Sequence, residues 1–323
     1  MALFSETWQS FQLWFIKVFG VEKEPSVQGH KPCAPAGAAV CCGEVIRMLM
    51  KLSQLTEEEK AILARLKAWL ALQLAAEAFR NDASLRELGP VGGVSLKLKI
   101  MQNGAAGHGE NTDSIGRRDI ASNLASNMQL LVKKGIASVG VRGWPQLVLF
   151  FPGREAAIKV LSGGKGAALP VPLSPGAFKA LRFFKKASGR ATELLREAQT
   201  PDMVRARLLL TATLHGLEAV SGDSYLERRM LIVPDGIVAV RVGQIEFFVA
   251  KRGRCITVME SARHPDAVLS FSDYQSAIKV LSGKRQAVVA LGFGEVKIEG
   301  LLPLVQGLFA VLDRLSWYLG VSV

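Results

Sequence analysis

Residues 157–163 read Ala-Ile-Lys-Val-Leu-Ser-Gly, and residues 277–283 read the same seven amino acids. Identical residues also align upstream at this offset of 120: Pro145 with Pro265, Val148 with Val268, Leu149 with Leu269, and Phe151 with Phe271. A seven-residue identity with matched flanking positions rarely arises by chance. The sequence therefore predicts an internal duplication.

The repeat extends upstream with a different spacing. The helical stretch 61–79 resembles 203–220 at an offset of 142 instead of 120. The first copy therefore carries about 22 additional residues between its helix and the repeated motif. Residues 104–126 are rich in Gly, Asn and Ser. This composition is typical of a surface loop, so we expect the insertion there.

Each copy is predicted to contain a long helix, several strands and a short helix. In the first copy, Thr56 and Glu59 form a capping box that starts a helix running to about Arg80. Its expected strands are Val94–Met101, Ile136–Val141 and Leu147–Phe151. The expected strands of the second copy are Met230–Val233, Ile237–Val242, Ile245–Ala250, Cys255–Glu260 and Val268–Phe271.

The repeated heptapeptide is interpreted as part of a packed helix. In the second copy, Ser272 and Gln275 form a capping box at its start, and Gly283 ends it. Lys279 lies in the last turns, where a cation suits the helix dipole. The alanine, isoleucine and leucine side chains supply an apolar face. The heptapeptide therefore indicates a common ancestry of the two copies and does not indicate a catalytic role.

Composition narrows the classes of function. The chain has 323 residues, of which 49% are hydrophobic, and a mean hydropathy of +0.24. No stretch reaches the roughly 18 consecutive apolar residues of a membrane-spanning helix. The net charge of +12 is spread over separate pairs of basic residues, so nucleic acid is not an expected partner. Anionic lipid headgroups account for this charge, and a basic surface without a specific partner accounts for it equally well.

The motif content argues against catalysis. The four cysteines have no CxxC spacing and the N-terminus lacks the basic region of a secretory signal, so we expect a cytoplasmic protein. The chain has no HExxH, Gly-x-Ser-x-Gly or Walker sequence, and its four histidines have no partners at ligand spacing. We therefore predict no enzyme, no catalytic residue, no cofactor and no metal. An enzyme site assembled only in the fold is the alternative.

The end of the second copy carries a series of short motifs. Leu269-Ser270-Phe271 is followed by Leu281-Ser282-Gly283-Lys284, then by Gly294-Glu295-Val296-Lys297-Ile298-Glu299-Gly300 and the apolar stretch Leu301–Leu319. In order and spacing these motifs resemble the sterol-carrier-protein-2 family. The resemblance implies an α+β fold, with a mainly antiparallel twisted sheet covered by helices around an apolar tunnel. It also implies binding of sterols, fatty-acyl chains or isoprenoid-type lipids without covalent chemistry.

The first copy departs from this pattern. It has Pro170, Pro172 and Pro175 where the last strand is expected. Because proline cannot donate to a sheet ladder, that strand is predicted to be lost or to lie at an edge. We therefore divide the chain into an amphipathic N-terminal helix (1–24), a flexible tether (25–43), a degenerate domain (44–199) and a lipid-binding domain (200–323).

Two groups of residues are predicted to make contacts. The apolar tunnel is expected to be lined by Phe247, Phe248, Phe271, Ile278, Leu281, Leu304, Leu308, Phe309, Leu312 and Trp317. An aromatic stripe at helical spacing is expected to contact an anionic membrane surface through Phe4, Trp8, Phe11 and Phe15. Docking of this stripe on the domain, on a protein partner or on a second copy is the alternative. The lipid ligand is carried between membranes or, alternatively, presented to a biosynthetic enzyme complex by an accessory protein.

Overall fold

The computed structural model describes residues 51–87, 93–101, 128–133, 135–140, 143–164, 166–197 and 199–320. The predicted amphipathic helix at 1–24 and the tether at 25–43 lie outside the described residues, as do Phe4, Trp8, Phe11 and Phe15. Within the described part of the chain, no helix combines the length and the apolar character needed to cross a membrane.

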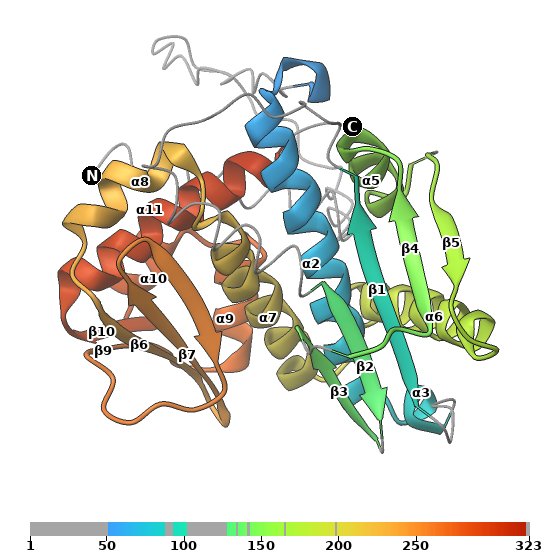
Figure 1. The fold of residues 1–323 in the computed structure, drawn as a ribbon. Helices are drawn as coiled ribbons and strands as arrows, with labels where there is room; N and C mark the ends of the chain where they lie inside the picture. The colour runs from blue at the N-terminus through green and yellow to red at the C-terminus, as the bar shows by residue number, and fades with distance from the viewer. Residues whose placement is uncertain are drawn as a thin grey trace, which may run out of the picture.

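The first half of the structure contains one five-stranded sheet and its helices (Figure 1). Its elements, in chain order, are a 3₁₀ turn η1 (Leu52–Gln54), α2 (Glu57–Asn81), α3 (Ala83–Glu87), β1 (Val94–Ile100), β2 (Gln129–Lys133), β3 (Ile136–Val139), β4 (Leu147–Phe151), α5 (Arg154–Leu161), β5 (Leu169–Pro172) and α6 (Ala177–Arg196).

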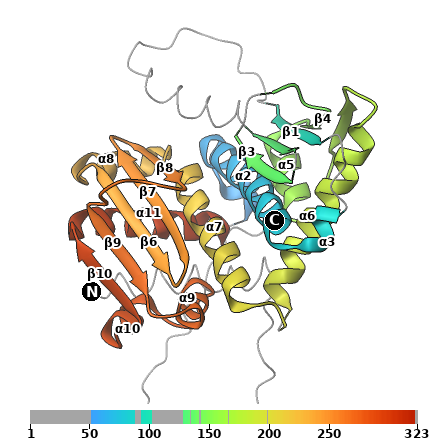
Figure 2. The ribbon, with the colours of Figure 1, turned by 90° about the horizontal axis from the view of Figure 1, so that it is seen from below.

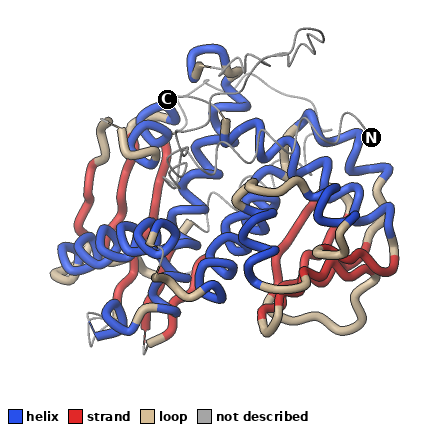
Figure 3. The backbone as a smooth tube through the Cα atoms, turned by 180° about the vertical axis from the view of Figure 1, so that it is seen from behind, coloured by secondary structure: helices blue, strands red, loops and turns tan. Residues whose placement is uncertain are grey.

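The second half contains another five-stranded sheet. Its elements are α7 (Asp202–Val220), α8 (Ser224–Ile232), β6 (Gly236–Val242), β7 (Ile245–Arg252), β8 (Cys255–Met259), β9 (Ala267–Phe271), α9 (Tyr274–Leu281), α10 (Ala287–Gly292), β10 (Val296–Gly300) and α11 (Leu302–Leu319). The two sheets lie on opposite flanks of the molecule, and the long helices α2 and α7 lie between them (Figures 1 and 2). The same arrangement is visible from behind, with helices against each sheet (Figure 3).

The two sheets have the same topology. Their strand orders are β3-β2-β1-β4-β5 and, read from the opposite edge, β8-β7-β6-β9-β10. In each sheet the central pair is parallel, β1 with β4 and β6 with β9, and the other three pairs are antiparallel. The predicted α+β class, with mainly antiparallel sheets covered by helices, is confirmed.

The strand registers reproduce the two offsets found in the sequence. Leu96 pairs with Leu147 in the first sheet, and Val238 pairs with Ala267 in the second. The central strands therefore correspond at an offset of 142 and their parallel partners at an offset of 120. Residues 101–128 separate β1 from β2, whereas only Gly243 and Gln244 join β6 to β7. The additional residues of the first half therefore fall between β1 and β2.

Reciprocal contacts join the two halves. The Arg65 guanidinium donates to the carbonyl of Ala219 at 3.0 Å, and Arg207 donates to the carboxylate of Glu77. At the offset of 142, position 207 corresponds to position 65 and position 219 to position 77. In an interface between two copies related by a two-fold axis, each contact recurs with the copies exchanged. The Arg65–Ala219 and Arg207–Glu77 contacts between α2 and α7 occupy positions related in this way.

The capping box predicted at Thr56 and Glu59 is confirmed. The Thr56 hydroxyl accepts from the Glu59 amide at 3.2 Å, and the Glu59 carboxylate accepts from the Thr56 amide at 3.0 Å. The capping box predicted at Ser272 is wrong by one residue, because Asp273 is the N-cap of α9 and accepts from the Ser276 amide at 2.7 Å. An ionised carboxylate accepts a backbone N–H bond more strongly than a neutral hydroxyl does.

Two strand assignments made from the sequence need correction. Residues 230–232 end helix α8, so the strand predicted at Met230–Val233 is wrong. Asp223 caps this helix, and Leu226 and Met230 are buried four residues apart on one face. A short apolar run does not by itself distinguish a strand from a helix end. Strand β2 was not expected, because residues 129–133 show no clear alternation of apolar and polar side chains.

The prolines of β5 lie at the free edge of the first sheet. The sequence left two alternatives for this strand, that it is lost or that it lies at an edge, and the structure has it at the edge. The Leu173 amide donates to the Gln146 carbonyl at 2.9 Å, so residues 169 and 171 also direct their backbone groups toward β4. Pro170 and Pro172 therefore occupy the positions whose N–H groups would point outward. Since proline has no N–H, this edge offers no donor there to another strand.

Candidate functional site

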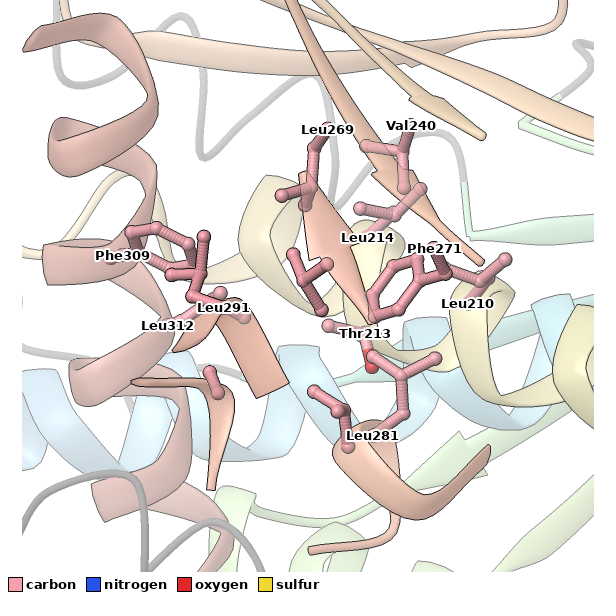
Figure 4. Close-up of a pocket in the computed structure, with 13 residues that line it drawn as sticks. Leu210, Thr213, Leu214, Val240, Leu269, Phe271, Leu281, Leu291, Phe309 and Leu312 are labelled. Carbon is pink, nitrogen blue, oxygen red and sulfur yellow. The ribbon is translucent and has the colours of Figure 1, made fainter. Parts of the chain in front are cut away.

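An apolar cavity lies inside the second half (Figure 4). Helix α7, strands β6, β9 and β10 of the second sheet, and helices α9, α10 and α11 all contribute side chains to its wall. The lining residues are Leu210, Thr213, Leu214, Val240, Leu269, Phe271, Val280, Leu281, Ala287, Leu291, Val296, Phe309 and Leu312. Thr213 alone among these thirteen residues has a side-chain polar atom.

Secondary-structure periodicity explains why these side chains converge. Val240 of β6 pairs with Leu269 of β9, and Phe271 pairs with Val296 of β10. Paired residues project from the same face of a sheet, so these four side chains point toward the helices. On α7, positions 210, 213 and 214 are three and four residues apart and therefore share one face of the helix.

The cavity is small in this state. The cavity volume is about 50 Å³. Such a space holds only a few waters, and an apolar lining offers them almost no hydrogen bonds. Ligand sites for small molecules are typically about 300–1,000 Å³. A lipid therefore requires a movement of one wall.

Helix α10 is the wall with the fewest restraints. It has only six residues and no side-chain cap, and it packs chiefly on α9 and β10. Ala287 and Leu291 face the cavity, while Val288 and Phe293 are 43% and 74% exposed on the other side. The described residues that join α5 to β5 in the first half form no such helix.

Helix α11, by contrast, is anchored by a polar network. The Arg314 guanidinium donates to Asp223 and, at 2.9 Å, to Glu59 at the start of α2. The buried Tyr318 hydroxyl donates to Asp223 at 2.9 Å. Burial, together with the nearby Asp223 charge, raises the pKa of the Tyr318 hydroxyl well above its usual value, so it remains protonated at neutral pH. This network holds the wall that carries Phe309 and Leu312.

Among the ten predicted tunnel residues, Phe271, Leu281, Phe309 and Leu312 line the cavity. The other six do not contribute to its lining. Phe247 lies under the Arg207 guanidinium, at 5.6 Å, near the junction with the first half. Trp317 lies under the Arg314 guanidinium at 3.9 Å. The remaining four are buried elsewhere in the second half: Phe248, Ile278, Leu304 and Leu308.

Sequence reasoning missed the contribution of α7. Leu210, Thr213 and Leu214 were not selected, although the spacing of apolar residues in 203–220 indicated a helix with a buried face. Nearly all of α7 is buried, since it packs on α2 and on the second sheet at once. The helical period therefore could not indicate which side faces a cavity. Ligand contact by any of these residues stays a prediction.

No group of three His, Cys, Asp or Glu side chains in the described part of the chain is placed to hold a metal ion. His215 contacts Glu218 at 2.9 Å and lies edge-on to Trp69, a structural arrangement at the junction of the halves. Burial raises the pKa of the Cys255 thiol, which opposes formation of the nucleophilic thiolate.

Comparison with known proteins gives matches only at the level of structure. No protein-family model matches the chain, and no curated protein matches it. About a third of the chain is similar to solved sterol-carrier-protein-2 domains. A UbiJ-SCP2 ubiquinone synthesis protein is 18% identical over 32% of this chain and 89% of its own, with a TM-score of 0.27.

Two insect domains give similar values. Sterol carrier protein domain 2 of Helicoverpa armigera is 20% identical over 33% of this chain and 88% of its own, with a TM-score of 0.26. Sterol Carrier Protein 2 Like 2 of Aedes aegypti is 14% identical over 32% of this chain and 96% of its own, with a TM-score of 0.25. At these scores the likeness assigns no role to any residue of this chain.

Proposed function

We propose that the second half binds a lipid in its apolar cavity without covalent chemistry and that the protein acts as a lipid carrier. The observation that carries this proposal is the cavity wall, which has twelve apolar side chains and one hydroxyl. Burial of an apolar ligand there gains about 25 cal/mol for each Å² removed from water. None of the thirteen described lining residues has a charged side chain for acid–base chemistry.

Entry of the ligand proceeds by displacement of α10. The helix is short and weakly restrained, and its movement joins the cavity to the solvent without disturbing the polar network of α11. Gly292 is the last residue of the helix, and Gly294 follows two residues later with a φ of +71°. Glycine at both positions allows the backbone to change direction there with little steric cost.

The outer surface of α10 suits contact with a membrane. Val288, Val289 and Phe293 are 43%, 39% and 74% exposed, and Lys284 and Lys297 are exposed nearby in the chain. Exposed apolar side chains partition into the lipid interface, and lysines are attracted to anionic headgroups. Contact through Phe4, Trp8, Phe11 and Phe15 stays a prediction of the same kind, on residues outside the described part of the chain.

We further infer that the two halves arose by tandem duplication of one α+β unit. The identical strand order, the matching registers and the reciprocal Arg65 and Arg207 contacts support this inference. The edge strand with Pro170 and Pro172 supports divergence of the first half, and the described residues that join α5 to β5 form no counterpart of α10.

Cavity filling tests the carrier proposal. Leu291→Trp places an indole in the cavity and is expected to reduce uptake of a fluorescent fatty-acyl or sterol probe at least tenfold, because the space for the ligand is occupied. Val289→Trp, on the outer side of the same helix, is the matched control and should leave uptake in solution unchanged. Uptake that is equal in both variants and in the wild type would exclude this cavity as the lipid site.

A further inference from the structure

Thr213 has a buried hydroxyl that forms no hydrogen bond with the described residues. The side chain lies on α7 in the wall of the cavity and is 4% exposed. Its Oγ1 has no hydrogen-bond partner in the part of the chain that the structure describes. Some other helix hydroxyls bond to the carbonyl four residues earlier, as Thr192 does at 3.1 Å and Ser316 at 2.8 Å, whereas Ser188 and Thr211 also have hydroxyls without a partner among the described residues.

An unpaired hydroxyl in an apolar wall lowers the stability of the unliganded protein, because the group has lost its bonds to water. Valine has nearly the same shape and would avoid this cost. A polar atom retained at such a position points to a partner that arrives with the ligand. Figure 4 shows the Thr213 oxygen among side chains that otherwise contain only carbon.

We propose that Thr213 is the polar contact of the cavity and binds a single neutral hydroxyl or carbonyl group of an otherwise apolar lipid. This inference rests on the proposed lipid-binding function and names the class of ligand. A threonine hydroxyl both donates and accepts, so it takes an alcohol or a carbonyl equally well.

The same wall selects against ionised lipids. None of the thirteen lining residues is charged. A carboxylate placed in the cavity would lose its hydration without gaining a cation, which is far more costly than the burial of a neutral hydroxyl. The cavity therefore favours a neutral lipid with one polar group over a fatty-acid anion of the same chain length.

Thr211 provides a matched control. It lies on the same helix, is 2% exposed and also has a hydroxyl without a hydrogen-bond partner among the described residues, but it does not line the cavity. Thr213→Val and Thr211→Val therefore make the same chemical change at the same depth. Only the first removes a group from the cavity wall.

The experiment measures displacement of the neutral fluorescent probe N-phenyl-1-naphthylamine from the full chain by 1-dodecanol, dodecane and dodecanoate at pH 8. The wild type is expected to bind dodecanol more tightly than dodecanoate. Thr213→Val should weaken dodecanol binding about three- to tenfold and leave dodecane binding unchanged, as loss of one hydrogen bond predicts. Thr211→Val should bind all three ligands as the wild type does.

Three results overturn the inference. If Thr213→Val weakens dodecanol and dodecane equally, or leaves both unchanged, the lipid site stands but Thr213 is not its polar contact. If dodecanoate binds as tightly as dodecanol, the selection against ionised lipids is wrong. If neither the probe nor any ligand binds the folded wild type, the proposed function itself fails. The thermal unfolding temperature of each variant is expected to equal or exceed that of the wild type, which verifies that folding is intact.

Discussion

Loss of the Glu77 carboxylate should weaken the junction between the two halves. Its side chain is 2% exposed, and it accepts hydrogen bonds from Arg80 at 3.2 Å, from Asn81 at 2.7 Å and from Arg207 of α7. The variant Glu77→Gln keeps the size of the side chain and removes its charge. Arg207 of α7 then loses this charged partner, and Arg80 keeps only its contact with Glu260, at 3.6 Å, among the ion pairs of the described residues.

The structure sets the magnitude of this effect. Removal of one partner from a fully buried ion pair costs about 3–5 kcal/mol. The side chains of Arg80 and Arg207 are 34% and 35% exposed, so water compensates part of their charge when Glu77 is changed. We therefore expect Glu77→Gln to lower the free energy of unfolding by about 2–3 kcal/mol.

A double-mutant cycle isolates the pair. Urea unfolding of Glu77→Gln, Arg207→Met and the double variant is expected to give a coupling energy of about 1–2 kcal/mol. The control cycle uses Arg241 and Glu246, which form an ion pair on the surface with side chains 49% and 39% exposed. That cycle should give about 0–1 kcal/mol. A Glu77–Arg207 coupling no larger than that of the control pair would refute the reasoning.

Two further predictions concern stability. Burial lowers the pKa of the Lys67 ammonium to about 8, so between that pH and its ordinary value of 10.5 the unfolded chain binds more protons and stability rises with pH. Lys67→Met should raise the free energy of unfolding by about 1–3 kcal/mol near pH 7 and should abolish the rise with pH. Urea unfolding at several pH values measures both effects, and an unchanged pH profile would contradict the prediction. Gly243→Ala should lower the free energy of unfolding by about 1–3 kcal/mol, because the φ of Gly243 is +55° and an added Cβ would lie 2.6 Å from the Tyr274 hydroxyl. Gly253→Ala, with φ of +56° and no atom within 4 Å of the added Cβ, should cost less, and equal losses in the two variants would contradict the steric argument.

Local features of this protein were readable from the sequence. The capping box at Thr56 fixed the start of α2, and the strand at Leu147–Phe151 was placed without error. Because proline lacks an N–H, the prolines at 170 and 172 left two alternatives, a lost strand or a strand at an edge, and β5 lies at the edge. The offsets of 120 and 142 located the insertion between β1 and β2. Each of these inferences depends on a backbone property or on alignment of the chain with itself.

Errors arose where local patterns permit two outcomes. Met230–Val233 is apolar and short, and only its packing with the rest of α8 decides that residues 230–232 are helical. At the start of α9, Ser272 and Asp273 both offer an oxygen, and the orientation of the chain leaving β9 places the Asp273 carboxylate over the free amide.

The cavity was decided by the tertiary structure alone. The sequence indicated the elements that contribute Phe271, Leu281, Phe309 and Leu312, but it could not separate them from Phe247 or Trp317, which are equally apolar and lie elsewhere. Helix α7 is buried nearly all round, so its pattern does not show that Thr213 faces a space. Whether apolar side chains meet or leave a gap depends on how elements distant in the chain approach one another, and no local pattern encodes that distance.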